Sequence, residues 1–160
     1  MSVEVKVTGG DKWQKSLQDM LQGPLKVKVG ILEGGSYSGG GHEAGANVAQ
    51  VAAWHEYGTS KGIPARAPFR TTLAEKRGEW VNGLKTLLAM NPQNPGAALT
   101  AIGEIAAHDI QAKIESGSLK ALADSTIREK ARLGYPHAAI PLVRTGEMMN
   151  AISSQLDDDE

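Results

Sequence analysis

His55 and Glu56 are the residues whose types and order first suggest catalysis, because a His-Glu pair opens the zinc-binding motif HExxH. That motif needs a second histidine four residues after the first, and the chain has Thr59 at that position. The other histidines, His42, His108 and His137, belong to segments of different type. A metal site would require these segments to converge, so we expect ordinary surface or helix-edge histidines and no bound metal.

The sequence also has no motif that indicates a catalytic nucleophile or a phosphate-binding loop. The chain has no cysteine, which excludes thiolate catalysis, disulfides and cysteine zinc sites. Ser36 and Ser38 lack a GxSxG context, and the glycine-rich segment from Gly34 to Gly45 lacks the Gly-Lys-Ser/Thr ending of a phosphate loop. We therefore predict that the protein is not an enzyme and binds no cofactor.

The charge balance gives no footprint of a nucleic-acid binder, since 17 basic and 18 acidic residues leave a net charge of −1. One local basic cluster is interrupted by Glu75 and Glu79, which favours a solvated or partner-facing surface. Its members are Lys61, Arg66, Arg70, Lys76 and Arg77.

Five residues in the same region have two competing interpretations: His55, Tyr57, Arg66, Phe69 and Arg70. In the first, the aromatic side chains cover the domain's own core and the segment is a stiff connector. In the second, the aromatic and arginine side chains contact a neighbouring subunit, because such side chains contribute strongly to interfaces. Both interpretations stay open at the level of the sequence.

A short helix must position this region. Apolar residues recur at helical spacing from Val48 to His55, which predicts a helix that ends near Tyr57. Gly58 follows, where a residue without a Cβ atom enters the left-handed conformation at little cost. Pro64 and Pro68 then favour an extended arm over residues 63–69, which carries the chain's only phenylalanine, Phe69.

The remaining pattern predicts a single α+β domain over residues 1–160, in which a small N-terminal β-sheet packs against four to five α-helices. Alternating valines predict a strand at 3–7, and a second strand follows at 25–31. Further helices are expected at 11–22, at 72–90 with a capping box of Thr72 and Glu75, at 95–116 after an Asn94 cap, and at 124–133. A brief final turn begins at Thr145.

Two segments are expected to lack fixed structure. The glycine-rich loop 33–46 is costly to order, and the acidic residues 155–160 are expected to form a disordered, solvated tail. No apolar run approaches the ~20 residues of a membrane span, and the N-terminus has no signal-peptide pattern, so we expect a cytosol-like compartment and no membrane partner.

Two ordered sequence blocks resemble a known family. WHEYGT followed by IPARAPFR in residues 54–70, and LADSTIREK followed by PLVRTGEMMNAI in residues 122–152, are similar to the tail-completion or neck (head-tail joining) proteins of tailed bacteriophages. The two blocks and the spacing between them span most of the chain, and two ordered motifs are more specific than either alone. The family pattern leads us to expect a strand after Thr145-Gly146, which here would be short because the acidic tail begins almost at once.

The resemblance implies a structural virion protein that completes or terminates the tail tube and joins it to the head connector as a homo-oligomeric ring, expected to be a hexamer. Expected partners are copies of itself, the tail tube protein and portal-side proteins, with passive DNA passage through the lumen. The protein would be in host cytoplasm during assembly and then in the virion. The alternatives are a minor tail or head-closure assembly factor or, in a different class, a small hydrolase or DNA-binding module. Candidate subunit-interface residues are His55, Tyr57, Gly58, Pro64, Arg66, Pro68, Phe69, Arg70, Thr145 and Gly146.

Overall fold

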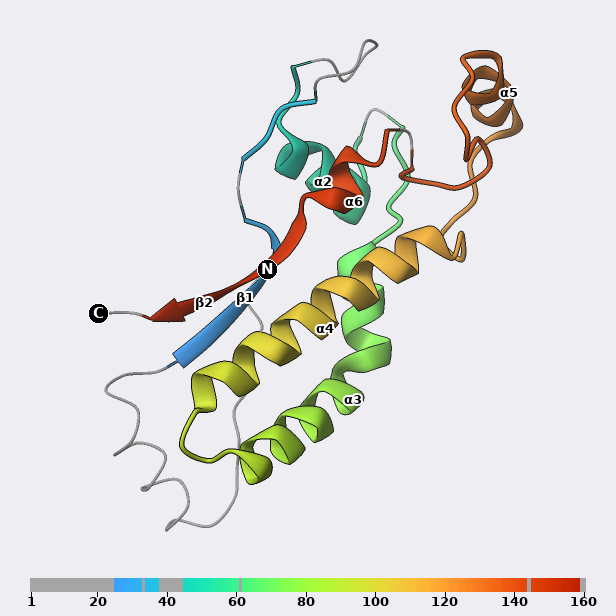
Figure 1. Cartoon of the computed structure of the whole chain (residues 1–160). Coiled ribbons are helices and arrows are strands. Elements are labelled where there is room, and N and C mark those ends of the chain that lie inside the picture. Colours follow the sequence, from blue (N-terminus) through green and yellow to red (C-terminus); the bar gives the residue numbers. More distant parts are fainter. Residues whose placement is uncertain (1–24, 33, 38–44, 61, 144, 159–160) are drawn as a thin grey trace.

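A computed structural model describes residues 25–32, 34–37, 45–60, 62–143 and 145–158 (Figure 1). Within these residues the chain forms five helices and two strands, which confirms the α+β class. Their order is β1 (Leu25–Ile31), α2 (Val48–Tyr57), α3 (Pro68–Met90), α4 (Pro95–Glu115), α5 (Asp124–Arg132), α6 (Glu147–Asn150) and β2 (Ile152–Asp158). The predicted strand 3–7, the predicted helix 11–22 and residues 38–44 of the glycine-rich loop lie outside the described residues.

The sheet pairs β1 with β2 in antiparallel register, from Leu25 opposite Asp158 to Ile31 opposite Ile152. The prediction of a disordered tail is therefore wrong for residues 155–158, which belong to β2. The acidic end is held because β1 is basic on its outer side: Lys28 Nζ lies 2.5 Å from an oxygen of Asp157. The prediction of a short last strand is also wrong, because β2 has seven residues, as many as β1.

Helices α3 and α4 form an antiparallel hairpin in which α4 packs on the sheet and α3 packs on α4 (Figure 1). Asn94 caps α4 as predicted, because its side-chain oxygen accepts a hydrogen bond from Ala97 N at 3.0 Å. The core lies between the two helices and the sheet. Its buried members include Trp80, Leu84 and Leu88 from α3, Ile102, Ala106, Ile110 and Ile114 from α4, and Val27, Val29 and Ile152 from the strands. Ile105 of α4 lies outside this core and is 48% exposed.

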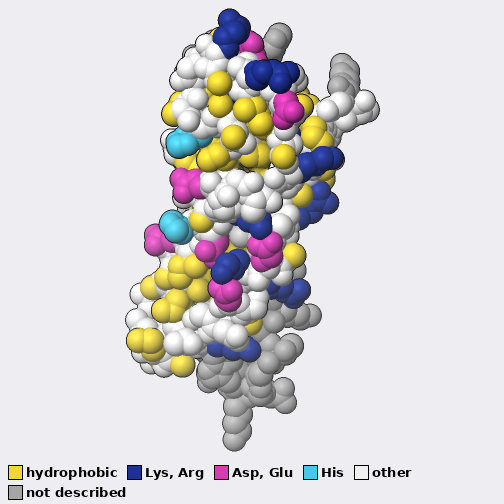
Figure 2. Space-filling model, turned by 90° about the vertical axis from the view of Figure 1, so that its right-hand side faces the viewer, with side chains coloured by type: hydrophobic (Ala, Val, Ile, Leu, Met, Phe, Trp, Pro, Cys, Tyr) yellow, Lys and Arg dark blue, Asp and Glu magenta, His cyan; other side chains and the backbone are white. Residues whose placement is uncertain are grey.

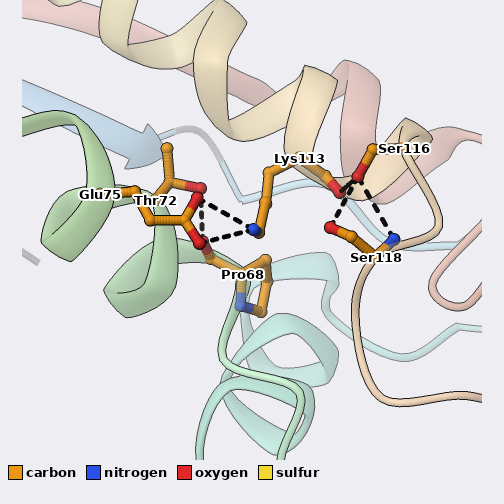
Figure 3. Close-up of polar contacts among 6 residues, drawn as sticks. All are labelled: Pro68, Thr72, Glu75, Lys113, Ser116 and Ser118. Carbon is orange, nitrogen blue, oxygen red and sulfur yellow. Dashed lines mark hydrogen bonds and ion pairs between the residues drawn. The ribbon is translucent and has the colours of Figure 1, made fainter.

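Polar contacts join the two helices at the end where α3 begins (Figure 3). Lys113 Nζ of α4 lies 2.8 and 2.9 Å from the two carboxylate oxygens of Glu75 on α3. The buried Thr72 hydroxyl donates to the carbonyl of Pro68 at 2.8 Å. Thr72 is thus inside the first turns of α3 and does not cap it, so the predicted capping box with Glu75 is wrong.

Close approach between α4 and the sheet depends on Gly103. A Cβ atom at this position would lie 2.5 Å from Val27 Cγ2 and 3.0 Å from Ser154 Cβ. Since real Cβ atoms are not found this close to other carbon atoms, the packing of α4 on both strands requires glycine here. Gly78 of α3 is different, because a Cβ atom there would meet nothing within 4 Å.

Helix α5 stands apart from the hairpin at the upper end of the molecule in Figure 1. It has no buried residue, and it begins after Ala123 without a side-chain cap. Gly134 follows its end with φ 77°, as predicted for a terminating glycine. No helix in the described part of the chain combines the length and apolar character that crossing a membrane requires.

Candidate functional site

The candidate site begins at the α2–α3 junction, which we define as residues 55–70. Helix α2 is capped by Asn47, whose side chain accepts from Gln50 N at 3.2 Å, and it ends at Gly58 as predicted. Gly58 has φ 77°, and a Cβ atom there would lie 3.0 Å from both Ala65 N and Ile63 O. The chain can turn back against α2 only because this position has no side chain.

The segment after Gly58 folds back onto α2. Thr59 N donates to Ile63 O at 2.9 Å, and the backbone N–H groups of Arg66 and Ala67 both donate to His55 O, at 2.8 and 3.2 Å. The predicted extended arm over residues 63–69 therefore ends earlier than expected, because α3 already begins at Pro68. Ala67, which precedes it, adopts the left-handed conformation with φ 47° and ψ 53°.

Glu56 joins the two helices. Its side chain is 4% exposed, and its two carboxylate oxygens accept hydrogen bonds from Phe69 N and Arg70 N, each at 3.0 Å. One oxygen also accepts from Arg70 Nε at 2.9 Å, while Arg70 Nη2 donates to Glu56 O at 2.6 Å. A carboxylate from α2 thus caps the N-terminus of α3, where backbone N–H groups lack intrahelical partners and negative charge is favoured.

Three of the candidate interface residues point inward. Pro68 is almost fully buried, and Phe69 is partly buried against the core. Arg66 is only 9% exposed, and its Nε donates to the carbonyl of Lys120 at 3.0 Å, which ties the junction to the segment after α4. Burial lowers the pKa of Arg66. For these three residues the structure matches the interpretation in which they support the domain's own core.

Tyr57 and Arg70 point outward. Tyr57 is 66% exposed, the Arg70 side chain is 50% exposed, and the Arg70 guanidinium lies 5.0 Å from the centre of the Tyr57 ring. Trp54, one turn earlier on α2, is 37% exposed. We call Trp54, Tyr57 and Arg70 the aromatic knob. Glu56 holds Arg70, and the Arg70 guanidinium in turn lies over one face of the Tyr57 ring.

The half-buried His55 side chain lies on the side of α2 opposite to Tyr57. Burial, with a smaller contribution from the charge of Arg66, lowers its pKa to about 4, so its imidazole is neutral at pH 7. Its Nδ1 atom is buried and has no hydrogen-bond partner among the described residues. The positive charge of Arg66 opposes protonation of the His55 imidazole, and the backbone bonds of the junction hold Arg66 close to His55.

A pocket of about 590 Å³ connects the two sequence blocks. Most of its lining residues come from α2, α5, α6 and the segment that connects α5 to α6. His55 of the first block lines it together with Leu142, Thr145, Gly146 and Met148 of the second, and Val51 of α2 adds an apolar side chain. The structure thus brings His55 together with Thr145 and Gly146, whereas Tyr57, Pro64 and Arg70 do not line the pocket.

Lys130 of α5 shapes one wall of this pocket. Its ammonium group donates to the carbonyls of His137, Ile140 and Val143 at 3.2, 2.9 and 2.6 Å. One side chain thereby satisfies three acceptors of the irregular segment that connects α5 to α6. Gly146 then reverses the chain with φ 81°, and Thr145 Oγ1 accepts from Glu147 N at 3.5 Å, as predicted for the Thr-Gly turn.

The described titratable side chains are distributed over separate segments. In the part of the chain that the structure describes, no three His, Asp or Glu side chains are grouped as metal ligands. His108 and His137 are exposed and lie in separate segments. Lys76 of the predicted basic cluster contacts Glu79 at 2.8 Å, and Arg66 is buried, so this cluster is not one continuous basic surface; Lys61 lies outside the described residues.

Sequence reasoning missed two residues that organise the site, Glu56 and Lys130. Glu56 carried a signal: it follows Val48 and Ala52 at four-residue spacing on the buried stripe, and a carboxylate is unfavourable at a helix C-terminus unless it has a dedicated partner. Lys130 carried none, since its three acceptors are backbone atoms. Comparisons of the chain with family models, with curated proteins and with solved structures found no match.

Proposed function

We propose that this protein is a structural component of a tailed-phage virion, which completes or terminates the tail tube and joins it to the head connector as a ring of identical subunits. Its mechanism is assembly by fitting surfaces together, with no catalytic step. The partners are other copies of the chain, the tail tube protein and proteins on the portal side.

The observation that carries this proposal is the meeting of the two family-like blocks at one pocket. They lie far apart in the sequence, yet His55 from the first and Leu142, Thr145 and Gly146 from the second line the same cavity. Motif residues that converge on one surface feature are expected when the motif encodes a shared binding geometry. The convergence supports a family-type function more strongly than two separate helical segments would.

The aromatic knob gives further support. Exposed Trp, Tyr and Arg side chains are the types that contribute most to protein interfaces. Here the partly buried hydrogen bonds of Glu56 hold Arg70 beside the Tyr57 ring, so this arginine loses little conformational freedom when a partner binds. A preorganised exposed surface of this type suits a building block that must join a larger particle in one orientation.

Interruption of the gene in its source phage or prophage tests the proposal. We expect particles in which filled heads and finished tails accumulate separately, as seen by negative-stain electron microscopy. Supplying the wild-type protein, or a Glu79→Ala variant changed at an exposed position, should restore joined particles. Infectious particles that lack this polypeptide at the junction of head and tail would disprove the proposed function.

A further inference from the structure

Helix α5 contributes one wall of the pocket. The lining residues in this part of the chain recur every three to four positions, which places them on one face of the helix and its flanking residues. They are Leu122, Ser125, Thr126, Glu129, Lys130 and Leu133. Val51 of α2 and Met148 of α6 line the same pocket, and each is only 2% exposed. If the α5 wall moves away, the pocket opens toward these two buried apolar side chains.

This wall is attached to the rest of the fold by few contacts. No residue of α5 is buried, and none of the main contacts between the described helices and strands involves it. The ion pair of Arg132 with Glu129, at 2.6 Å, lies within α5, so it is kept when the helix moves. Segments with few buried apolar contacts open at a lower free-energy cost than the core of a fold. We therefore expect α5 to detach before the core unfolds.

The chain on either side of α5 is, by contrast, anchored in the fold. Leu119 is 7% exposed and belongs to the core, and the carbonyl of Lys120 accepts a hydrogen bond from Arg66 Nε at 3.0 Å. After α5, Pro141 is almost fully buried and Val143 packs against the core. The movable part thus has defined ends, and we call residues 121–140 the α5 flap.

A hydrogen bond of Lys130 joins the flap to its anchored end. Of the three carbonyls that accept from its ammonium group, those of His137 and Ile140 belong to the flap itself. The third belongs to Val143, outside the flap, and its distance of 2.6 Å is the shortest of the three. Hydrogen bonds from a charged donor are shorter and stronger than neutral ones. We propose that the α5 flap moves away from α2 and α6 to open the pocket, and that Lys130 is the latch that keeps it closed.

Opening changes what the protein presents at this end of the molecule. Figure 2 shows hydrophobic side chains gathered at the upper end, which carries α5 in Figure 1. Release of the flap adds the pocket side of Val51 and Met148 to the exposed apolar surface. Contiguous exposed apolar surface marks sites of contact with other molecules. The flap thus controls access to the pocket, a property that goes beyond the assembly role proposed above and does not depend on it.

Thiol labelling measures the opening, because the chain has no cysteine of its own. Val51→Cys and Met148→Cys each place a thiol at a buried position in the pocket, whereas Ala98→Cys places one at a core position, 5% exposed, that does not line the pocket. Dithionitrobenzoate reaches a pocket thiol when the flap opens and the core thiol only when the domain unfolds. Relative to the same thiol in urea-unfolded protein, we expect the pocket thiols to react at least roughly 10-fold faster than the core thiol. Equal relative rates would overturn the flap.

Lys130→Met tests the latch, because it keeps the length of the side chain and removes its donors. It should speed labelling of the pocket thiols by at least about 10-fold, since one hydrogen bond to a charged group is worth a factor of that order. The matched control is Ile110→Val, which shortens a buried core side chain outside the pocket and should speed only the core thiol, by about 2- to 10-fold. The core stays packed while the flap is open, so the pocket thiols should not respond to this control.

Two results would reject the proposal. If Ile110→Val accelerates the pocket thiols as much as the core thiol, the pocket is reached only through global unfolding and the flap does not open by itself. If Lys130→Met leaves the pocket thiols at their original rate, Lys130 is not the latch.

Discussion

Replacement of Glu56 by alanine tests whether a buried carboxylate from α2 holds the start of α3. The change removes the acceptor of Phe69 N and Arg70 N, both at 3.0 Å, and of Arg70 Nε at 2.9 Å. A hydrogen bond to a charged group contributes about 1.5–3 kcal/mol to stability. The ion pair adds little, because half of the Arg70 side chain is exposed and solvent screens it.

Two effects reduce the sum of these contributions. Water can reach part of the first turn of α3 once the carboxylate is gone, since Phe69 is only partly buried and Arg70 is exposed. Removal of a negative charge from the C-terminus of α2 also returns about 0.3–1 kcal/mol. We therefore expect Glu56→Ala to lower the free energy of unfolding by about 2–3 kcal/mol, and Glu56→Gln by roughly half as much, because the amide keeps one acceptor oxygen.

Urea denaturation followed by circular dichroism measures this difference, and thermal unfolding should show a Tm lower by about 5–10 °C for Glu56→Ala. The matched control is Glu79→Ala, which removes an exposed carboxylate paired with Lys76 on α3 and should change stability by less than about 0.5 kcal/mol. If Glu56→Ala is no more destabilising than Glu79→Ala, then Glu56 does not anchor the junction.

Four further variants probe separate features. Gly103→Ala should destabilise the fold by about 1–3 kcal/mol in urea denaturation, because its Cβ atom would lie 2.5 Å from Val27 Cγ2, whereas Gly78→Ala in open space should stabilise α3 by up to about 1 kcal/mol. Ala67→Gly should raise the unfolding free energy by about 1 kcal/mol by relieving the left-handed strain at φ 47°, and a loss of stability would contradict the observed conformation. The pKa of His55 is lowered from 6.5 to about 4 in the folded protein, so the unfolded state binds the proton first as pH falls. The free energy of unfolding should therefore drop by on the order of 2–3 kcal/mol between pH 6.5 and 4. His55→Asn should flatten this part of the pH profile.

Local chemistry made several helix ends predictable. Gly58 ends α2 and Asn94 with Pro95 begins α4, because each effect acts within a few residues of its own position. The start of α3 was misplaced because its cap is Glu56, which comes from another helix and leaves no mark at Thr72. Propensity and capping rules describe neighbours in sequence, so a cap supplied by a distant residue escapes them.

Rules for neighbouring residues could not predict the sheet or the pocket either, because both join segments that are distant in the sequence. The acidic end of the chain has the composition of a solvated tail, and it forms a strand because Lys28 and the apolar side of α4 lie opposite it. The pocket joins residues near position 50 to residues near position 145, a pairing that no local pattern encodes. The α+β class needed only the number and type of the elements, and it was therefore predictable.

Pairing of β1 with β2 has a consequence for synthesis of the chain. Every described helix lies between the two strands, so a ribosome completes all of them before it makes the partner of β1. At a translation rate of ~5–20 residues per second, β2 is made on the order of ten seconds after β1, so the backbone groups of β1 that face β2 lack this partner during that time. The α3–α4 hairpin can form during this interval, and the sheet closes only when Ile152–Asp158 leaves the exit tunnel, which makes strand pairing the last step in folding of the newly made protein.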